Sequence, residues 1–143
     1  MLAETSFKII TGPNGIPEVR LENCVVRLIT PRIVEDRMNE GGVIDVNDVN
    51  AVKKTHERLC PGETYAVLVT FTHFNTITKE ARRLMASADF VKRSLGKALL
   101  VHNTAAKLVA EFYLRVNKPE MQTRVFTDRE KAIDWLKELV KAG

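Results

Sequence analysis

From residue 45 onward, the sequence alternates between helical patterns and short apolar runs. The run TYAVLVTF, residues 64–71, is apolar and β-branched almost throughout, which is typical of a strand buried on both faces of a sheet. KALLVH, residues 97–102, reads as a second buried strand, and MQTRVF, residues 121–126, as a short final strand. Because strands that alternate with helices are joined by right-handed crossovers, this order predicts a largely parallel sheet.

The first two helical segments lie on either side of the 64–71 strand. Asp45 is a predicted N-cap for a helix over residues 46–59, with apolar residues at helical spacing. His56 lies within that helix and is expected to pack in the interior. Residues 79–95 are predicted to form one broken helix or two short ones, with a break near Ser87, and Gly96 is expected to stop the helix.

Two further helices are predicted in the last third of the chain. Residues 103–117 form an amphipathic pattern whose inward-facing residues are expected to be Leu108, Val109, Phe112 and Val116. In residues 127–143, Thr127 and Glu130 have the spacing of a capping box. The apolar face of this final helix consists of Ala132, Ile133, Leu136, Leu139 and Val140.

The N-terminal part is predicted to be extended. Residues 24–30 and 33–38 read as two antiparallel strands joined by a tight turn at Pro31. Residues 1–21 are an N-terminal lead-in that could add a strand or a hairpin, and residues 22–143 are assigned to the folded domain. The expected architecture is an α/β fold in which an N-terminal β-hairpin feeds a mixed, largely parallel sheet of about five strands with four main helices.

Composition limits the classes of function. The 143 residues are 45% hydrophobic without long apolar blocks, which is typical of a soluble globular protein, and no run reaches the ~18–20 residues of a membrane span. We therefore expect a cytoplasmic protein. Cys24 and Cys60 lack metal-site spacing and read as ordinary buried or half-buried thiols. The glycines of GPNG do not open a helix after a strand, so no nucleotide-type cofactor is predicted.

The net charge of +4 is mild, although the second half of the chain is more basic than the first. A basic half could favour an acidic partner or a phosphorylated ligand, or could simply be a solvated surface. No compact Lys/Arg block with interleaved aromatic residues is present, which argues against nucleic-acid binding.

The stretch HFNTITKEARR, residues 73–83, joins the buried strand to the next helix. Thr78 is placed to cap that helix, whereas Thr76 is freer to face solvent and is the better candidate for phosphorylation. Arg82, or Arg83 beside it, lies about one turn beyond Thr78 and could reach an anion at the helix start. The alternative is that the arginines are ordinary surface residues.

His102, Asn103 and Thr104 end the next strand. Carboxyl ends of parallel strands meet at one edge of a sheet, so the loops 73–78 and 102–104 are expected to line one cleft. Asn103 or Thr104 could instead serve only as a helix cap. His73 and His102 both fall near this edge, but no third ligand lies close to either in sequence, so no metal site is predicted.

A family resemblance rests on residues 98–136, ALLVHNTAAKLVAEFYLRVNKPEMQTRVFTDREKAIDWL. They contain a strand, an Asn-Thr helix start, a helix ending in Asn-Lys-Pro, a short strand ending in Phe-Thr and an Ala-x-x-Trp-Leu final helix. TKEARRLMAS, residues 78–87, resembles the preceding helix of the same group. Over residues 22–140 the chain resembles the STAS domain of anti-sigma-factor antagonists, the SpoIIAA-like fold, and in particular a bacterial group of small SpoIIAA-like proteins of unassigned function.

The resemblance implies a non-enzymatic interaction or regulatory module that binds a protein partner or a second copy of itself. Phosphorylated STAS domains carry a serine in an Asp-Ser-x-Gly turn at the junction that matches residues 73–78. This chain has neither the Asp-Ser pair nor the glycine there, so only Thr76 and Thr78 offer hydroxyls. An alternative is a carrier of a small apolar ligand or lipid, with a cavity like that of CRAL-TRIO domains. A third alternative is a small hydrolase-type enzyme that uses His73 or His102.

Overall fold

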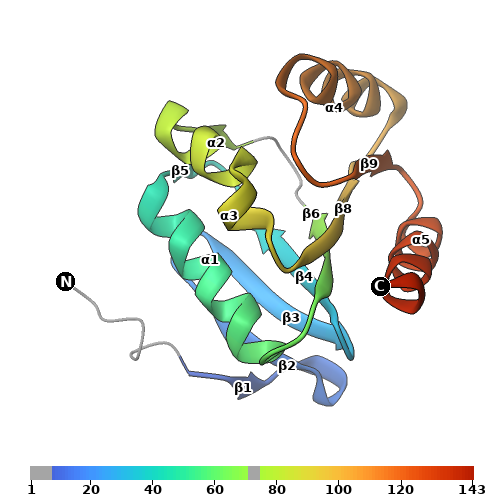
Figure 1. Cartoon of the computed structure of the whole chain (residues 1–143). Coiled ribbons are helices and arrows are strands. Elements are labelled where there is room, and N and C mark those ends of the chain that lie inside the picture. Colours follow the sequence, from blue (N-terminus) through green and yellow to red (C-terminus); the bar gives the residue numbers. More distant parts are fainter. Residues whose placement is uncertain (1–7, 71–74) are drawn as a thin grey trace.

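The computed structural model describes residues 8–70 and 75–143. Its main element is a seven-stranded sheet with the strand order β1-β2-β3-β4-β6-β8-β9 (Figure 1). These strands are β1 (Ile10–Thr11), β2 (Pro17–Arg20), β3 (Cys24–Thr30), β4 (Ile33–Met38), β6 (Tyr65–Thr70), β8 (Ser94–Leu100) and β9 (Thr123–Phe126). A separate parallel pair consists of β5 (Val43–Ile44) and β7 (Thr76–Ile77). The helices are α1 (Val46–Leu59), α2 (Lys79–Ala86), α3 (Ala88–Val91), α4 (Thr104–Asn117) and α5 (Arg129–Ala142).

The sheet is mixed, as predicted. Strands β1 to β4 pair antiparallel, and β4, β6, β8 and β9 pair parallel. The predicted hairpin is confirmed as β3 and β4, and the broken helix is confirmed as α2 and α3 with Ser87 between them. No helix in the described part of the chain combines the length and the apolar character needed to cross a bilayer.

The prediction of about five strands was wrong, because β1 and β2 extend the sheet beyond β3. The side chain of Val19 in β2 is fully buried. The neighbouring carboxylate of Glu18 accepts hydrogen bonds from Arg20 Nε at 2.9 Å and Arg27 Nε at 3.1 Å. Burial of an apolar residue and pairing of a buried charge both hold β2 against β3.

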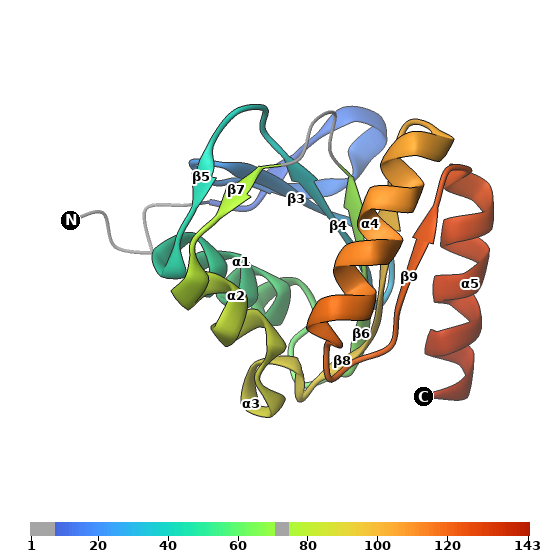
Figure 2. The same cartoon turned by 90° about the horizontal axis from the view of Figure 1, so that it is seen from above.

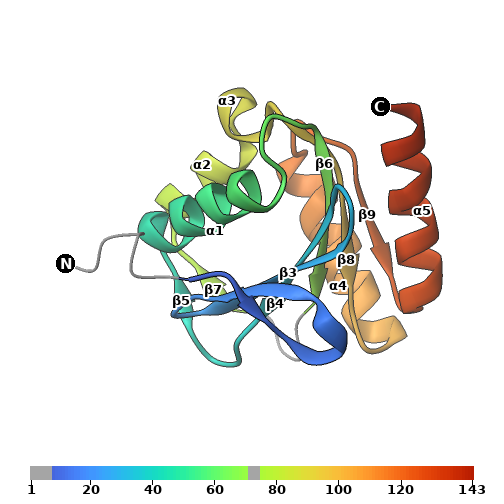
Figure 3. The ribbon, with the colours of Figure 1, turned by 90° about the horizontal axis from the view of Figure 1, so that it is seen from below.

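Helices cover the two faces of the sheet unequally. Helices α1, α2 and α3 lie on one side and α5 on the other (Figure 3). Ala132 and Leu136 of α5 are fully buried against Ala66, Leu68 and Ala98 of β6 and β8, which confirms the predicted face of the final helix. Helix α4 packs over β8 and β9 through a small cluster of its own. The remaining stretch of sheet, between α1 and α4, forms the floor of the cleft described below.

Gly96 does not stop a helix; it lies inside β8. A Cβ atom at this position would lie 2.5 Å from Leu139 Cδ1 of α5 and 3.2 Å from the backbone oxygen of Gln122. The glycine therefore allows α5 and the segment leading into β9 to approach the strand closely.

The predicted inward face of α4 was also wrong. Its buried contacts are made by Ala106, Ala110 and Leu114, which pack on Val101 and Val125. The apolar residues expected inside are exposed instead: Leu108 by 62%, Val109 by 57%, Phe112 by 63% and Val116 by 65%. Ala106, Ala110 and Leu114 thus form the packed side of α4, and the apolar residues expected inside lie on its other sides.

The cap of α5 differs from the predicted Thr127–Glu130 box. Asp128 is the N-cap, and its Oδ1 accepts hydrogen bonds from the backbone N–H groups of Glu130 and Lys131. Aspartate at this position also places a negative charge at the positive end of the helix dipole. The capping box is found at α1, where Asp45 and Asp48 each accept a hydrogen bond from the other's backbone N–H.

Candidate ligand-binding cleft

A large cleft is lined by residues of α1, α2, α3 and α4 and by residues of the sheet. Figure 2 shows how α4 and the group formed by α1, α2 and α3 are placed over that sheet. The cleft has a volume of about 1250 Å³, which exceeds the roughly 300–1,000 Å³ of typical small-molecule sites. Most of the lining is apolar. The apolar residues include Met38, Val52, Val67, Val69, Met85, Phe90, Leu99, Val109 and Tyr113.

Strand register places the floor residues of the cleft. In adjacent strands, Val34, Val67, Lys97 and Thr123 form one cross-strand row, and Asp36, Val69, Leu99 and Val125 form the next. Because side chains alternate between the two faces of a strand, both rows point to the α1 side of the sheet. The floor is therefore mainly apolar, with one carboxylate and one ammonium group in it.

Asp36 forms a pair with His56 of α1 at the cleft. His56 Nε2 lies 2.6 Å from Asp36 Oδ1, and both residues are only 6% exposed. The imidazole ring also packs edge-on against Tyr65, with ring centroids 5.3 Å apart. The expectation that His56 packs in the interior is confirmed, and the structure adds a hydrogen-bonded carboxylate to its surroundings.

Lys53 of α1 interacts with two other residues of the cleft lining, Tyr65 and Phe90. Its Nζ donates a hydrogen bond to the hydroxyl of Tyr65 at 3.0 Å and lies 5.2 Å from the ring centroid of Phe90. Burial disfavours the charged form of both groups, so it lowers the pKa of Lys53 and raises the pKa of Tyr65. The ammonium group of Lys53 is thus held by a hydroxyl and an aromatic ring.

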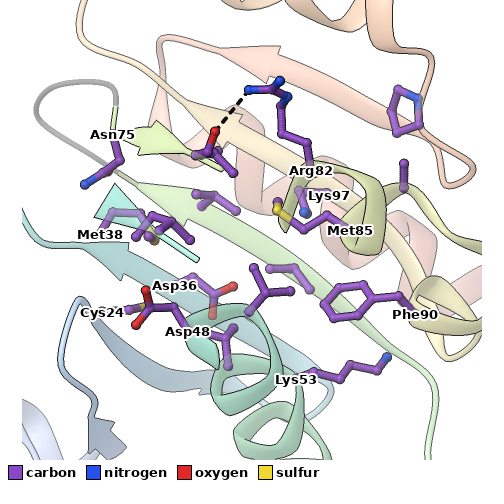
Figure 4. Close-up of a pocket in the computed structure, with 18 of the residues that line it drawn as sticks. Cys24, Asp36, Met38, Asp48, Lys53, Asn75, Arg82, Met85, Phe90 and Lys97 are labelled. Atoms are coloured by element: carbon purple, nitrogen blue, oxygen red, sulfur yellow. Dashed lines mark hydrogen bonds between the residues drawn. The ribbon is translucent and has the colours of Figure 1, made fainter. Parts of the chain in front are cut away.

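Lys97 is the other cation of the cleft interior, and it rises from the floor strand β8. Figure 4 shows it facing the same hollow as Asp36, Met85 and Phe90. Among the described residues, no hydrogen bond or ion pair reaches its Nζ. Burial lowers the pKa of Lys97, whereas the negative charge of Asp36 acts in the opposite direction.

The two thiols do not form a disulfide. Cys24 and Cys60 are free and buried, as predicted. Burial raises the pKa of both thiols, so both are held in the protonated form. Cys24 lines the cleft (Figure 4), where it acts as a small apolar residue.

The residues predicted around the 73–78 junction lie near the cleft, and the two arginines line it. Thr78 caps α2, since its Oγ1 accepts a hydrogen bond from the backbone N–H of Ala81 at 3.1 Å. Thr76 is exposed in β7. Arg82 lines the cleft and donates a hydrogen bond from Nη1 to the carbonyl oxygen of Ile77 at 3.0 Å. Arg83 lines it as well.

The second predicted group lies outside the cleft lining. His102 is exposed, and Asn103 caps α4, with its Oδ1 accepting a hydrogen bond from the backbone N–H of Ala106 at 2.8 Å. Thr104 is the exposed first residue of α4. His73 falls outside the described residues, so its distance from His102 is not tested.

Sequence reasoning overlooked the polar residues of the cleft interior. Asp36 lies inside β4, IVEDRM, and Lys97 lies inside β8, SLGKALL, so each places a charge on the inner face of a buried strand. That pattern was the available signal, because a charged residue on the inner face of a buried strand needs a partner or a function. The pattern KALLVH makes Lys97 the first residue of its predicted strand, where a charge is unremarkable, but the strand begins at Ser94.

Comparisons with known proteins agree with the fold and attach no activity to it. A family model described as a domain of unknown function (DUF7793) matches residues 28–140. The crystal structure of an uncharacterized protein from the DUF3478 family, from Shewanella loihica PV-4 and with a SpoIIAA-like fold, superposes with a TM-score of 0.51. It is 14% identical over 91% of this chain and 94% of that chain. The predicted SpoIIAA-like fold is thereby confirmed. No curated protein sequence matches the chain.

Proposed function

The chain belongs to the DUF7793 family, a domain of unknown function, and we propose that it is a non-enzymatic binding module whose cleft takes up a small, largely apolar ligand. The volume of about 1250 Å³ between α4 and α1–α3 carries this proposal. An apolar hollow of this size is costly to keep in water unless a ligand removes its surface from solvent.

Two features of the cleft favour binding over catalysis. Asp36 pairs with His56, and Lys53 pairs with Tyr65, so these polar groups hold the wall together.

The two free buried thiols suit a reducing compartment, and we place the module in the cytoplasm. A regulatory role would follow if ligand occupancy changed how the domain meets a partner.

The experiment uses the neutral dye N-phenyl-1-naphthylamine, whose fluorescence rises in apolar sites. We expect saturable binding of one dye per chain. Met85→Gln replaces an apolar side chain in the cleft wall and should weaken dye binding about fivefold, because roughly 1 kcal/mol of apolar contact is lost. Ile9→Gln makes the same kind of change at an exposed residue outside the cleft and should leave binding unchanged.

Absence of saturable dye binding would contradict the proposal, as would equal weakening by the two variants. Native mass spectrometry of the protein purified from its own host adds an independent reading. A bound small molecule of defined mass that leaves when the protein unfolds would identify the natural ligand.

The exposed apolar side of α4 supports a second candidate function, association with another copy of the chain. Leu108, Phe112 and Val116 recur at every fourth residue and form a continuous stripe. Lys107, Glu111 and Arg115 follow one edge of that stripe. In an antiparallel pair of α4 helices this edge meets itself, so acidic and basic residues of the two chains meet along it. Such a twofold contact is self-complementary in apolar surface.

Phe112→Asp tests this candidate. Placing a carboxylate at the centre of the stripe should raise the dimer dissociation constant more than about tenfold, since an unpaired charge would be buried against an apolar surface. Sedimentation velocity across a range of concentrations measures the effect. Lys137→Asp on the exposed side of α5 is the control. A wild-type chain that stays monomeric at every concentration would rule this contact out.

A further inference from the structure

The two carboxylates inside the cleft have hydrogen-bond partners, whereas the ammonium group of Lys97 has none among the described residues. The carboxylate of Asp36 bonds to His56. The carboxylate of Asp48 accepts hydrogen bonds from Asn23 Nδ2 at 3.1 Å and from the backbone of Asp45 at 3.0 Å. Lys97 lies between Val67 and Thr123 of the neighbouring strands, and its Nζ has no partner among the described residues. The floor therefore presents an unpaired ammonium group to an open, apolar cavity.

An ammonium group in such surroundings is costly, because low-polarity neighbours replace the water that would solvate it. An anion bound inside the cleft would supply the missing partner, and its hydrogen bond would be strengthened by charge. The net charge of the cleft lining is positive, which suits an anionic ligand. Cationic residues outnumber anionic ones there, with Lys53, Lys54, Lys79, Arg82, Arg83 and Lys97 against Glu22, Asp36 and Asp48.

We infer that the ligand is an amphiphile whose anionic head, a carboxylate or a phosphate, binds Nζ of Lys97 while its apolar tail lies along the cleft. The tail would contact Val69 and Leu99 on the floor and Met85 and Phe90 on the wall. This inference rests on the proposed function and specifies its ligand class. Lys97 is the specificity-determining residue of the site, and the basic residues at Arg82 and Arg83 raise the local concentration of anions.

The test compares three ligands that share one alkyl chain, octanoate, octyl phosphate and octan-1-ol, by displacement of N-phenyl-1-naphthylamine. In the wild-type protein the two anions should displace the dye at about tenfold lower concentration than the alcohol. Lys97→Met keeps a similar apolar stem and removes the charge. This variant should lose the preference for the anions and keep the affinity for octan-1-ol. Lys137→Met, on exposed α5, should behave as wild type.

Lys97→Arg provides a second variant, since it keeps the charge and should keep the preference for the anions. A difference between octanoate and octyl phosphate would identify which head group the site accepts. Equal displacement by the alcohol and both anions, with the dye still bound, would overturn the inference and leave the proposed function standing. Failure of the dye to bind at all would instead overturn the proposed function. An equal loss of all three ligands in Lys97→Met would assign Lys97 a packing role and also overturn the inference.

Discussion

Replacing Arg129 with methionine is expected to lower the free energy of unfolding by about 3 kcal/mol, because it leaves a buried carboxylate without its cation. Glu35 is only 3% exposed, and Arg129 holds it through two hydrogen bonds, from Nη2 to Oε1 at 2.8 Å and from Nη1 to Oε2 at 3.0 Å. Thr70 Oγ1 donates a third at 2.9 Å. The pair ties the first residue of α5 to β4, which lie far apart in the sequence. Urea denaturation measures the loss.

The control is Lys131→Met, which removes an exposed cation from the same helix. A double variant, Glu35→Gln with Arg129→Met, removes both charges and should recover part of the lost stability. If Arg129→Met costs no more than Lys131→Met, the pair contributes nothing and the prediction fails.

The same pair predicts a pH dependence. Burial raises the pKa of Glu35, but the hydrogen bonds and charge of Arg129, with the hydroxyl of Thr70, outweigh it and hold the pKa below its ordinary value of 4.5. The stabilisation is therefore fully present above pH 4.5 and is lost as the pH falls through the lower pKa of the folded state. The difference in unfolding free energy between wild type and Arg129→Met should be larger at pH 7 than near pH 3. A difference that does not change with pH would contradict this assignment.

Much of the fold could be predicted from local patterns. The strand boundaries at 24–30 and 33–38, the cap at Asp45, the cap at Thr78 and the break at Ser87 all match the structure. Each depends on residues within a few positions of one another, through turn chemistry, capping or side-chain alternation. The family resemblance added the SpoIIAA-like arrangement of these elements.

The errors concern long-range contacts. The pattern of α4 shows an apolar stripe, but a stripe does not state which surface covers it, and Phe112 remains in solvent. Gly96 resembles a helix stop in the sequence. In the structure a glycine is needed there because Leu139 of α5 comes close to β8. Glu18 is buried favourably in β2 because Arg27 of β3 donates a hydrogen bond to its carboxylate. In each case the deciding contact joins elements that local patterns treat separately.

The candidate site shows the same limit. Sequence reasoning placed Arg82 near a ligand-facing edge, and Arg82 lines the cleft, but the other nominated residues on the second loop do not. The cleft interior depends on register: Lys97 stands beside Val67, and Asp36 beside Val69, because β4, β6 and β8 align in parallel. Register is fixed by packing across the whole sheet, so the composition of one strand does not reveal it.

Replacing Asp36 with alanine is expected to lower the free energy of unfolding by about 2 kcal/mol, because His56 would lose its buried partner. Both residues are 6% exposed, so neither can exchange the lost hydrogen bond freely for bulk water. The effect reaches beyond one bond, since His56 also packs on Tyr65, which in turn accepts the hydrogen bond from Lys53. Loss of the pair should loosen the contact of α1 with β4 and β6, the wall that faces the cleft.

Asp36→Asn is the matched control, because its amide retains an oxygen at the position of Oδ1 that can still accept a hydrogen bond from the imidazole. It should cost clearly less stability than Asp36→Ala in chemical denaturation followed by circular dichroism. If alanine and asparagine cost the same, the hydrogen bond that an amide oxygen can still accept contributes nothing, and this prediction fails. A smaller loss in Asp36→Asn, together with retained dye binding, would show that the hydrogen bond orders the wall while the floor strands shape the cleft.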